Sequence, residues 1–443
     1  GGTMGFAALG VASVLMLVAF LLGLHVAATL GILSFSLMYF FSDRPLWEML
    51  GLVAWNTNTS FVLVAIPLFI LMGEVLLRSG LSDRLYRVLS LWLRPLPGGL
   101  MHSNIAACAT FAAVSGSSVA TAATIGSVAL PAFRARGYDE RLVLGSLAAG
   151  GTLGILIPPS ISFIVYGVLM EVSIGKLYMA GFVPGIMLSL LFMAIIFGAA
   201  LIWPNIAPRE PAAPLRELLR SLVDMVPTFF LIFLVLGTIY LGVATPTEAA
   251  AFGVVGSFVL AALARRLNLS MLKRVSISSV RTTAMVMLIL TGAFILNSIL
   301  ALLGVPYAIS QWVASSGLSP TATMILIVVF YLVLGTFMDG FSMMVTTIPV
   351  ILPILKTQNV DLVWFGVVAT ILTEAALISP PEGLNLYVIH ALRDRATEEQ
   401  RKHTIMDVYV GVLPFFIMMI VAIVILMVFP QIALWLPTTM KGN

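Results

Sequence analysis

The 443-residue chain has very little charge and almost no cysteine. Asp, Glu, Lys and Arg together make up 9% of the residues, whereas 60% are hydrophobic and the mean hydropathy is +1.10. Soluble domains carry about a quarter charged residues, so this composition excludes that class and indicates an all-α, multi-pass membrane protein. The single Cys108 excludes an internal disulfide or a thiolate cluster, and we expect it to be a packed side chain.

Motifs of several enzyme classes are also missing. The sequence contains no nucleotide-binding loop, nucleophile elbow or zinc signature, which argues against an ATP-driven pump, an intramembrane hydrolase or any other enzyme. The net charge of +4 comes from residues that lie mainly between apolar runs, so it reflects membrane topology and not a nucleic-acid surface. We therefore expect no catalytic residue and no nucleic-acid partner.

What the sequence does contain is an internal repeat marked by proline. Pro131 and the pair Pro158-Pro159 recur as Pro353 and the pair Pro380-Pro381, each 222 residues later. Proline lacks a backbone donor and breaks a helix. Within a bilayer such a break is tolerated only where it is buried in protein or lines a polar cavity. Helix breaks at Pro159 and Pro381, at matching positions of two halves, therefore indicate a transport site.

The charges indicate that the two repeats are inverted relative to each other. The stretch 78–94 contains four arginines, whereas its counterpart 304–320 contains no charge. Conversely, 171–176 has one basic residue, and 393–403 has three arginines, one lysine and one histidine. Basic loops remain on the cytoplasmic side, so equivalent loops lie on opposite sides of the membrane. The arginines in 81–94 fit either a helix at the membrane surface or a cytoplasmic loop.

We divide the chain into four parts by this pattern. Residues 1–100 are expected to form scaffold spans and the surface helix, and 101–203 the first transport repeat. Residues 204–303 are expected to form a linker and further scaffold spans, and 304–443 the second repeat. This gives roughly 11 to 12 spans, with 42–60 as a polar stretch and 204–224 as the linker. The apolar run 5–41 fits one span bent near Gly23 or two spans.

The polar residues of the two repeats predict different ligand chemistry. Residues 99–133 and 142–170 carry hydroxyls but no Asp, Glu, Lys or Arg. This suits a hard monovalent cation such as Na⁺ bound by carbonyl and hydroxyl oxygens. The second repeat adds Asp339, Glu374 and Glu382, and intramembrane carboxylates are usually functional. Whether these three bind a cation, relay protons or pair within the bundle stays open. The small residues in 112–126 are also typical of close helix packing.

The sequence resembles the large membrane subunit of tripartite ATP-independent periplasmic (TRAP) transporters. The resemblance covers essentially the whole chain, and five ordered motifs carry it. They are AVSGSSVATAATIG at 113–126, GTLGILIPPS at 151–160, ATPTEAAA at 244–251, LGTFMDG at 334–340 and ISPPEGLN at 378–385.

The resemblance implies a Na⁺-coupled importer of the bacterial inner membrane. In that family a periplasmic binding protein delivers a small organic anion, such as a sialic acid or a C4-dicarboxylate, to a small four-helix subunit joined to the large one. Two re-entrant hairpins and two broken helices would move as an elevator against a scaffold, in contact with membrane lipid. The cofactor would be Na⁺, with two or more ions per cycle.

By position, the resemblance also implies the site residues. The first Na⁺ site would comprise Ser115, Gly116, Ser118, Thr152, Gly154 and Pro158. The second would comprise Gly335, Thr336, Asp339, Thr373, Glu374, Ser379 and Pro380. The substrate would contact Ser117, Ser118, Thr121, Gly340 and Asn385.

Two other hypotheses stay open. The chain is alternatively a stand-alone symporter of an anion with Na⁺ or H⁺, needing neither small subunit nor binding protein. It is alternatively a non-transport scaffold or channel, in which the prolines are only kinks. The sequence does not identify the anion, the number of Na⁺ ions or the oligomeric state.

Overall fold

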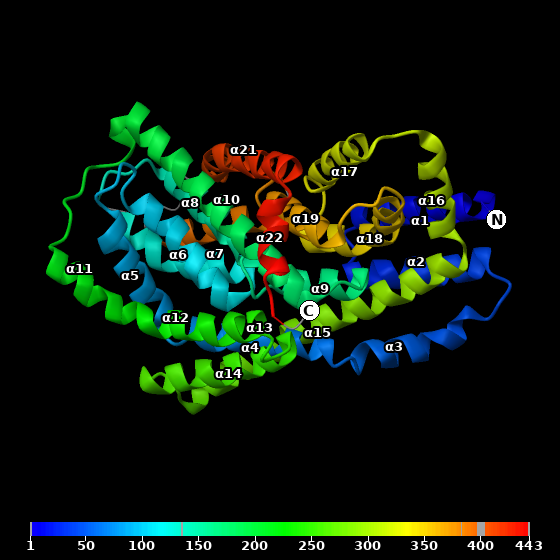
Figure 1. Cartoon of the computed structure of the whole chain (residues 1–443), viewed down its shortest axis with the longest axis horizontal. Coiled ribbons are helices and arrows are strands. Elements are labelled where there is room, and N and C mark those ends of the chain that lie inside the picture. Colours follow the sequence, from blue (N-terminus) through cyan, green and yellow to red (C-terminus); the bar gives the residue numbers. More distant parts are fainter. Residues whose placement is uncertain (1, 134–135, 382, 397–403, 442–443) are drawn as a thin grey trace.

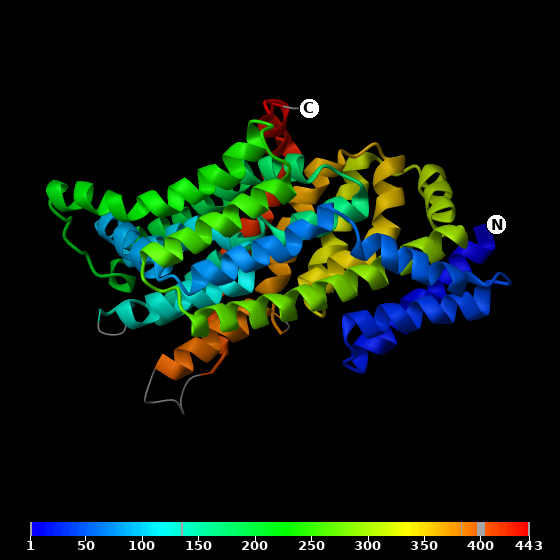
Figure 2. The same cartoon turned by 90° about the horizontal axis from the view of Figure 1, so that it is seen from below.

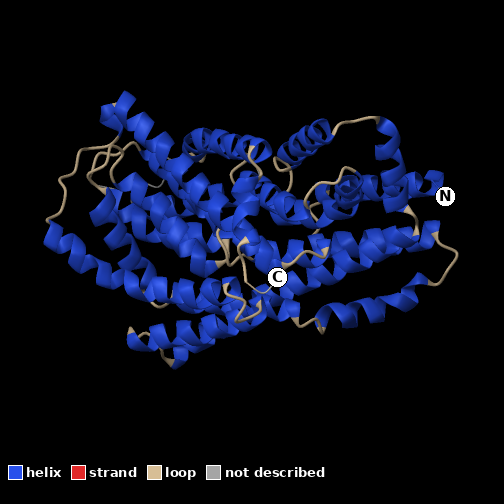
Figure 3. Cartoon of the chain, viewed as in Figure 1, coloured by secondary structure: helices blue, strands red, loops and turns tan. Residues whose placement is uncertain are grey.

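The computed structural model describes residues 2–133, 136–381, 383–396 and 404–441. Helices joined by loops make up this part of the chain, and no strand occurs in it (Figure 3). The expected all-α fold is therefore confirmed. One candidate carboxylate, Glu382, lies outside the described residues.

The N-terminal part of the chain holds seven α-helices, the last two of which are joined by a tight turn. In chain order they are α1 (Gly2–Leu21), α2 (Val26–Phe41), α3 (Leu50–Asn58), α4 (Ala65–Leu77), α5 (Leu81–Leu93), α6 (Leu100–Ser115) and α7 (Ser118–Phe133). The chain turns between α1 and α2 at Gly23, whose φ of +73° suits glycine, so the run 5–41 forms two helices.

The middle of the chain holds the first broken helix, α8 with α9, and six further helices. These helices are α8 (Glu140–Thr152), α9 (Ile161–Met170), α10 (Ile174–Ile202), α11 (Leu215–Ser221), α12 (Val226–Ile232), α13 (Thr238–Tyr240), α14 (Pro246–Leu263) and α15 (Leu269–Leu302). Helices α11 to α13 follow one another as a single apolar rod, Leu215–Tyr240. Within the expected linker 204–224, residues 204–206 form a 3₁₀ turn after α10, 207–214 are non-helical, and 215–224 begin this rod.

The last third contains the second hairpin and the second broken helix. Its helices are α16 (Val305–Ser316), α17 (Pro320–Leu334), α18 (Gly340–Thr357), α19 (Leu362–Leu377), α20 (Leu384–Ala396), α21 (Met406–Val428) and α22 (Gln431–Thr438). Several of these helices are capped at the N-terminus by a polar side chain that accepts backbone hydrogen bonds. Asp361 caps α19 in this way, and Ser319 caps α17.

Among the described residues, seven helices are long and apolar enough to cross a membrane. The bent pair Leu46–Asn58 and Val62–Leu77, at 59°, adds an eighth candidate. The polar stretch expected at 42–60 is thus helical for most of its length, because its polar residues alternate with Trp and Leu. Six shorter apolar helices, among them α6, α7, α17 and α19, account for the difference from the expected 11 to 12 spans.

The two broken helices run antiparallel to each other. At one end Arg393 Nε of α20 contacts Glu140 Oε1 of α8 at 2.6 Å, and at the other Tyr166 Oη of α9 donates to the Leu362 carbonyl of α19 at 2.5 Å. Between them Asn385 Nδ2 donates to the Ala148 carbonyl at 3.1 Å. The second repeat therefore runs in the opposite direction to the first, as the charge pattern predicts.

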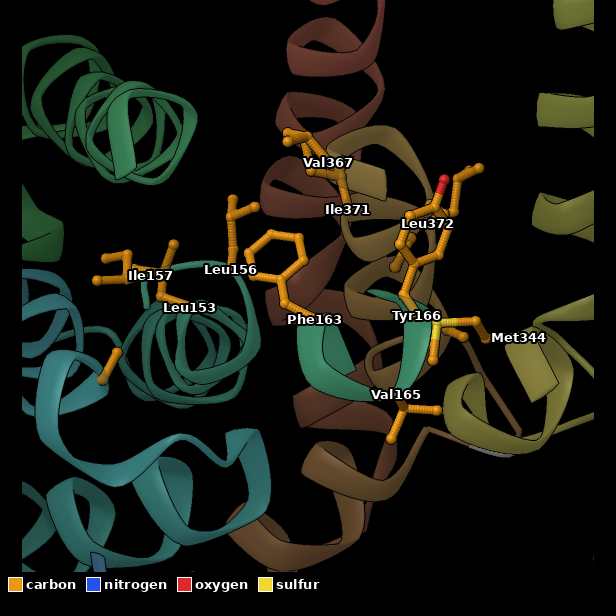
Figure 4. Packing of buried hydrophobic residues seen from close by; sticks show 14 of the residues in the cluster. Leu153, Leu156, Ile157, Phe163, Val165, Tyr166, Met344, Val367, Ile371 and Leu372 are labelled. Carbon is orange, nitrogen blue, oxygen red and sulfur yellow. The ribbon is translucent and has the colours of Figure 1, made fainter. Parts of the chain in front are cut away.

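The core lies where these helices meet. In Figure 4, Phe163 of α9 lies beside Leu156, and Tyr166 lies beside Leu372 and Met344 of the second repeat. Outside this core, α14 and α15 lie along α4, while α16, α17 and α1 occupy the opposite end of the molecule from α5 and α11 (Figures 1 and 2). The broken helices α8–α9 and α19–α20 thus pack against α10 and α21, whereas α17 lies at the periphery.

Candidate functional site

The tip of the first hairpin is a tight turn between α6 and α7. Gly116 ends α6 with a φ of +69°, a conformation that favours glycine. Ser115 Oγ and Thr121 Oγ1 are 2.7 Å apart, and the Thr121 hydroxyl also donates to the Ser117 carbonyl at 2.7 Å. The expected tip at 115–118 is therefore present, and its hydroxyl and carbonyl oxygens are gathered within one turn.

The first helix break lies directly against this tip. Helix α8 ends at Thr152, a short 3₁₀ turn covers Leu153–Ile155, and α9 begins at Ile161 after the two prolines. Ser118 Oγ donates to the Thr152 carbonyl at 3.1 Å. A Cβ on Gly154 would lie 2.4 Å from the Ser117 carbonyl oxygen, so only glycine permits this approach. The structure thus brings the residues of the predicted first Na⁺ site together.

The remaining residues of that site lie along the same junction. The Gly116 carbonyl accepts from Ile161 N at 3.5 Å, and Gly116 faces the Pro159 carbonyl. The Pro158-Pro159 bond is cis, as is Pro380-Pro381. The oxygen atoms at this junction belong to backbone carbonyls and to serine and threonine hydroxyls, which are ligands that hard cations prefer.

The second tip has a longer turn, and its helices α17 and α18 pack on α19 more than on each other, unlike α6 and α7. Helix α17 ends at Leu334 and α18 begins at Gly340, with Gly335, Thr336 and Asp339 in the turn. A Cβ on Gly340 would lie 2.8 Å from the Thr373 carbonyl oxygen, and one on Gly335 would lie 3.0 Å from Ala376 Cβ. This second tip therefore packs against α19 as closely as the first tip packs against α8.

Two residues predicted for the second Na⁺ site lie at the end of an intact helix. Helix α19 continues through Thr373 and Glu374 to Leu377, and the non-helical segment that contains Pro380 and Pro381 starts at Ile378. Thr373 and Glu374 therefore precede the second break by one turn, because nothing before Pro380 interrupts the backbone hydrogen bonds. Ser379 lies within it, and its hydroxyl donates to the Ala375 carbonyl at 2.6 Å.

Asp339 has a local partner. Its carboxylate accepts from Ser342 N at 3.0 Å and from the Ser342 hydroxyl, so it caps the N-terminus of α18. A carboxylate at this position also stabilises the positive end of the helix dipole. The Asp339 carboxylate is therefore engaged in helix capping, although it stands at the predicted cation site.

Glu374 and Asn385 have unsatisfied oxygens in the interior. The Glu374 side chain is 0% exposed, and among the described residues neither carboxylate oxygen has a hydrogen-bond partner. Asn385 is equally buried and donates to Ala148, but its Oδ1 has no partner there. Buried polar atoms are nearly always satisfied, so these oxygens fit a bound cation or proton. Within the described residues, the second repeat therefore contains buried oxygen atoms that are free to bind a ligand.

Sequence reasoning missed a buried polar chain that supports the first hairpin. Tyr86 Oη of α5 donates to Asn104 Oδ1 of α6 at 2.9 Å, and Asn104 Nδ2 donates to Ser146 Oγ of α8 at 2.9 Å. This chain joins the surface helix, the hairpin and the broken helix. The signal available in the sequence was Asn104, an asparagine within the mostly apolar segment that forms α6.

Sequence reasoning also missed an ion-pair cluster at the basic end. The Arg393 side chain is 3% exposed and contacts Glu140 at 2.6 Å and Asp407 at 2.8 Å. Arg141 contacts the same Asp407 carboxylate at 3.1 Å. Nearby, a Cβ on Gly145 of α8 would lie 2.0 Å from the Gly411 carbonyl oxygen of α21, so these two helices approach at backbone distance. The cluster fixes α8, α20 and α21 relative to one another.

Antiparallel broken helices, each with a hairpin tip against it, define a membrane transporter built from an inverted repeat. Residues 13–432 match the family described as tripartite ATP-independent periplasmic transporter, DctM component, and the chain belongs to this family. It is a multi-pass protein of the bacterial inner membrane. The family consists of transporter permeases, and the matches indicate no catalytic activity.

Individual relatives and a solved structure agree with this assignment. The chain is 34% identical over 389 residues to the C4-dicarboxylate TRAP transporter large permease protein DctM of Pseudomonas aeruginosa, covering 88% of this chain and 89% of that protein. It is 30% identical to the sialic acid TRAP transporter permease protein SiaT of Haemophilus influenzae, covering 98% of this chain and 69% of that protein. The crystal structure of the Alcanivorax borkumensis YdaH transporter superposes with a TM-score of 0.65 over 89% of this chain and 88% of its own. At 15% identity that likeness concerns the fold alone.

Proposed function

We propose that the chain is the large permease subunit of a Na⁺-coupled importer, which moves a small organic carboxylate into the cell by an elevator movement. Family membership supports the transport class. The observation that supports the rest is the pair of tip contacts, Ser118 with Thr152 and Gly340 with Thr373, in two repeats of opposite direction. A site between two such tips becomes accessible from either side when the tips move together against a fixed scaffold.

One Na⁺ is proposed for each tip. In the first repeat the cation is bound by the oxygens at Ser115, Gly116, Ser118 and Thr152, and in the second by those near Thr336, Thr373, Glu374 and Ser379. Oxygen-only coordination favours a hard cation, and the described residues contain no cluster of three His, Cys, Asp or Glu suited to another metal. When bound, Na⁺ supplies positive charge in a region that has no Lys or Arg of its own.

The substrate is proposed to lie between the tips, in contact with Ser117, Ser118, Thr121, Asn385 and Gly340. Both relatives are named for a carboxylate, a C4-dicarboxylate in one case and sialic acid in the other. Neither tip nor break offers a basic side chain to a carboxylate. Tip amides, hydroxyls and the two cations therefore hold the anion, so substrate binding requires Na⁺.

Two partner proteins complete the proposed importer. A periplasmic binding protein delivers the anion, and a small four-helix membrane subunit packs on the scaffold. The sialic acid relative supports the second partner, because this chain covers only 69% of its length. We propose that the remaining part of that relative corresponds to a separate small subunit here.

The elevator movement is proposed to occur between the hairpin regions and α4 with its neighbours. A Cβ on Gly73 of α4 would lie 2.8 Å from the Ser115 carbonyl oxygen, so the first tip and the scaffold touch through backbone atoms. Polar side chains do not bridge this particular contact. Because glycine has no side chain, the first tip is able to move along α4 at this contact without breaking an ion pair.

Uptake of a labelled carboxylate into proteoliposomes tests the proposal. The chain is reconstituted with its small subunit, and the binding protein, a C4-dicarboxylate or sialic acid, and an inward Na⁺ gradient are each supplied or withheld. We expect uptake only when the gradient and the binding protein are both present, and Pro381→Ala should reduce it. Uptake that persists without the binding protein supports the stand-alone symporter, and uptake that ignores Na⁺ contradicts the proposed coupling.

A further inference from the structure

An arginine-lined cavity of about 520 Å³ lies at the basic end of the molecule, away from the tips. Its size falls in the range of about 300–1,000 Å³ typical of small-molecule sites. The arginines that line it are Arg84, Arg87, Arg94, Arg136 and Arg266. They come from α5, from the segment after α7 and from the loop before α15, so three separate parts of the chain direct positive charge to one place.

Few of these charges are neutralised by the protein. Arg136 pairs with Glu210 at 2.9 Å, and Arg94 Nε donates to the Pro211 carbonyl at 2.9 Å. Among the described residues, Arg84, Arg87 and Arg266 form no ion pair. Asp83 is the acidic side chain in the lining. The cavity therefore keeps an excess of positive charge that attracts an anion.

The other walls of the cavity are apolar. Leu91 of α5, Leu100 of α6, and Val128 and Ala132 of α7 line it. Free phosphate gains nothing from such a surface, whereas a phospholipid places its phosphate among the arginines and its first acyl carbons on the apolar side. This combination favours an amphiphilic anion over a small inorganic one.

The distribution of charge indicates that the cavity faces the cytoplasm. Arg84 and Arg87 of α5 and Arg266 lie in arginine-rich segments between apolar runs, and such segments stay on the cytoplasmic side. Basic pockets between membrane helices on that side bind anionic headgroups. Ala132 is 14 residues beyond Ser118 on α7, about 21 Å along the helix, so this is a different site from that of the substrate.

We propose that this cavity binds the headgroup of an anionic phospholipid of the cytoplasmic leaflet. Arg84 and Arg87 contact the phosphate, Arg266 approaches it from the scaffold, and Ala132 and Val128 contact the glycerol and upper acyl carbons. Because α7 belongs to the first hairpin and Arg266 to the scaffold, the bound lipid connects these two parts. The proposal does not depend on which substrate the chain transports.

Native mass spectrometry of the full chain in neutral detergent tests this site by titration with phosphatidylglycerol. The variant Arg84→Gln/Arg87→Gln removes two cavity charges. The matched control Arg216→Gln/Arg220→Gln removes two exposed arginines from α11, outside the cavity. We expect the cavity variant to bind phosphatidylglycerol at least about tenfold more weakly, since each basic residue near an anionic lipid contributes about 1 kcal/mol. The control should bind like the wild type.

Two further arms identify the source of the phosphate and protect against misfolding. Zwitterionic phosphatidylcholine should bind at least about tenfold more weakly than phosphatidylglycerol, and excess inorganic phosphate should not displace the lipid. Arg266→Gln, on a separate element, should also weaken binding. Equal loss in the cavity variant and the control, equal binding of both lipids, or displacement by inorganic phosphate would overturn the proposal.

Discussion

The two hairpin tips share a geometry but differ in chemistry. In the first, Ser118 contacts the end of α8, and the surrounding side chains are hydroxyls without charge. In the second, Gly340 contacts α19, and the neighbouring helix carries the buried carboxylate of Glu374. Glu374 stands 222 residues after Thr152, so a carboxylate occupies the place of a hydroxyl. An inverted repeat thus preserves backbone contacts while its side chains diverge.

The largest expected effect on stability comes from the ion-pair cluster that connects α20 of the second repeat to α8 of the first. Replacing Arg393 by methionine (Arg393→Met) removes the two charge-assisted hydrogen bonds from its buried guanidinium to Glu140 and Asp407, which lowers the free energy of unfolding by about 3 kcal/mol. Arg141→Met is the matched control, because its side chain is 59% exposed and its pair contributes about 0–1 kcal/mol. Denaturant unfolding of both variants measures the difference, and equal losses would contradict the central role of Arg393.

The next largest effect is expected from the glycines that allow the close backbone contact at each tip. Gly154→Ala and Gly340→Ala each place a methyl group against a carbonyl oxygen, at 2.4 Å and 2.8 Å, and overpacking of this kind costs about 1–3 kcal/mol. We expect both variants to lose uptake to a similar degree, about tenfold or more. Gly198→Ala is the control, because a Cβ there meets nothing within 4 Å. Loss in only one tip variant would show that the two tips are not equivalent.

A smaller effect separates the chemistry of the two cation sites. Glu374→Gln keeps the shape of the side chain but removes its charge, so the Na⁺ concentration for half-maximal uptake should rise about tenfold, the equivalent of one charge-assisted contact. Thr152→Val is the counterpart in the first repeat. Its hydroxyl already donates to the Ala149 carbonyl at 2.5 Å, so we expect a change of about threefold or less. Unaltered Na⁺ dependence in Glu374→Gln would exclude this carboxylate from the cation site.

The smallest effect concerns the hydroxyl that joins the first tip to its helix. Ser118→Ala removes the hydrogen bond to the Thr152 carbonyl, at a cost of about 1 kcal/mol. We expect thermal unfolding to begin slightly earlier and uptake to fall about fivefold or less. Ser127→Ala, on the exposed side of α7, should change neither quantity. Equal behaviour of the two serine variants would show that the Ser118 contact has no importance.

Local chemistry explains which features the sequence predicts. Proline pairs end helices wherever they occur, so both breaks and the antiparallel arrangement follow from Pro158-Pro159, Pro380-Pro381 and the distribution of arginine. Pro381 lies in the non-helical segment after α19, but the proline pair does not specify how far α19 extends, and it includes Thr373 and Glu374. The assignment of each residue to Na⁺ or substrate, and the four-part division of the chain, stay predictions.

Long-range contacts explain what the sequence does not predict. Arg393 and Glu140 are 253 residues apart, and nothing in either segment identifies the other as its partner. The chain from Tyr86 through Asn104 to Ser146 likewise depends on how α5, α6 and α8 pack. The arginine cavity exists only because Arg266 lies beside Gly80 in the folded protein.

The most direct measurement is the number of Na⁺ ions that move with each substrate molecule. The reversal of substrate flux is followed in proteoliposomes at set Na⁺ and substrate gradients, with the wild type and Glu374→Gln side by side. We predict at least two Na⁺ per substrate in the wild type, one for each tip, and the same ratio in the variant only at Na⁺ concentrations about tenfold higher. A flux reversal that does not depend on the Na⁺ gradient would contradict the two-cation arrangement.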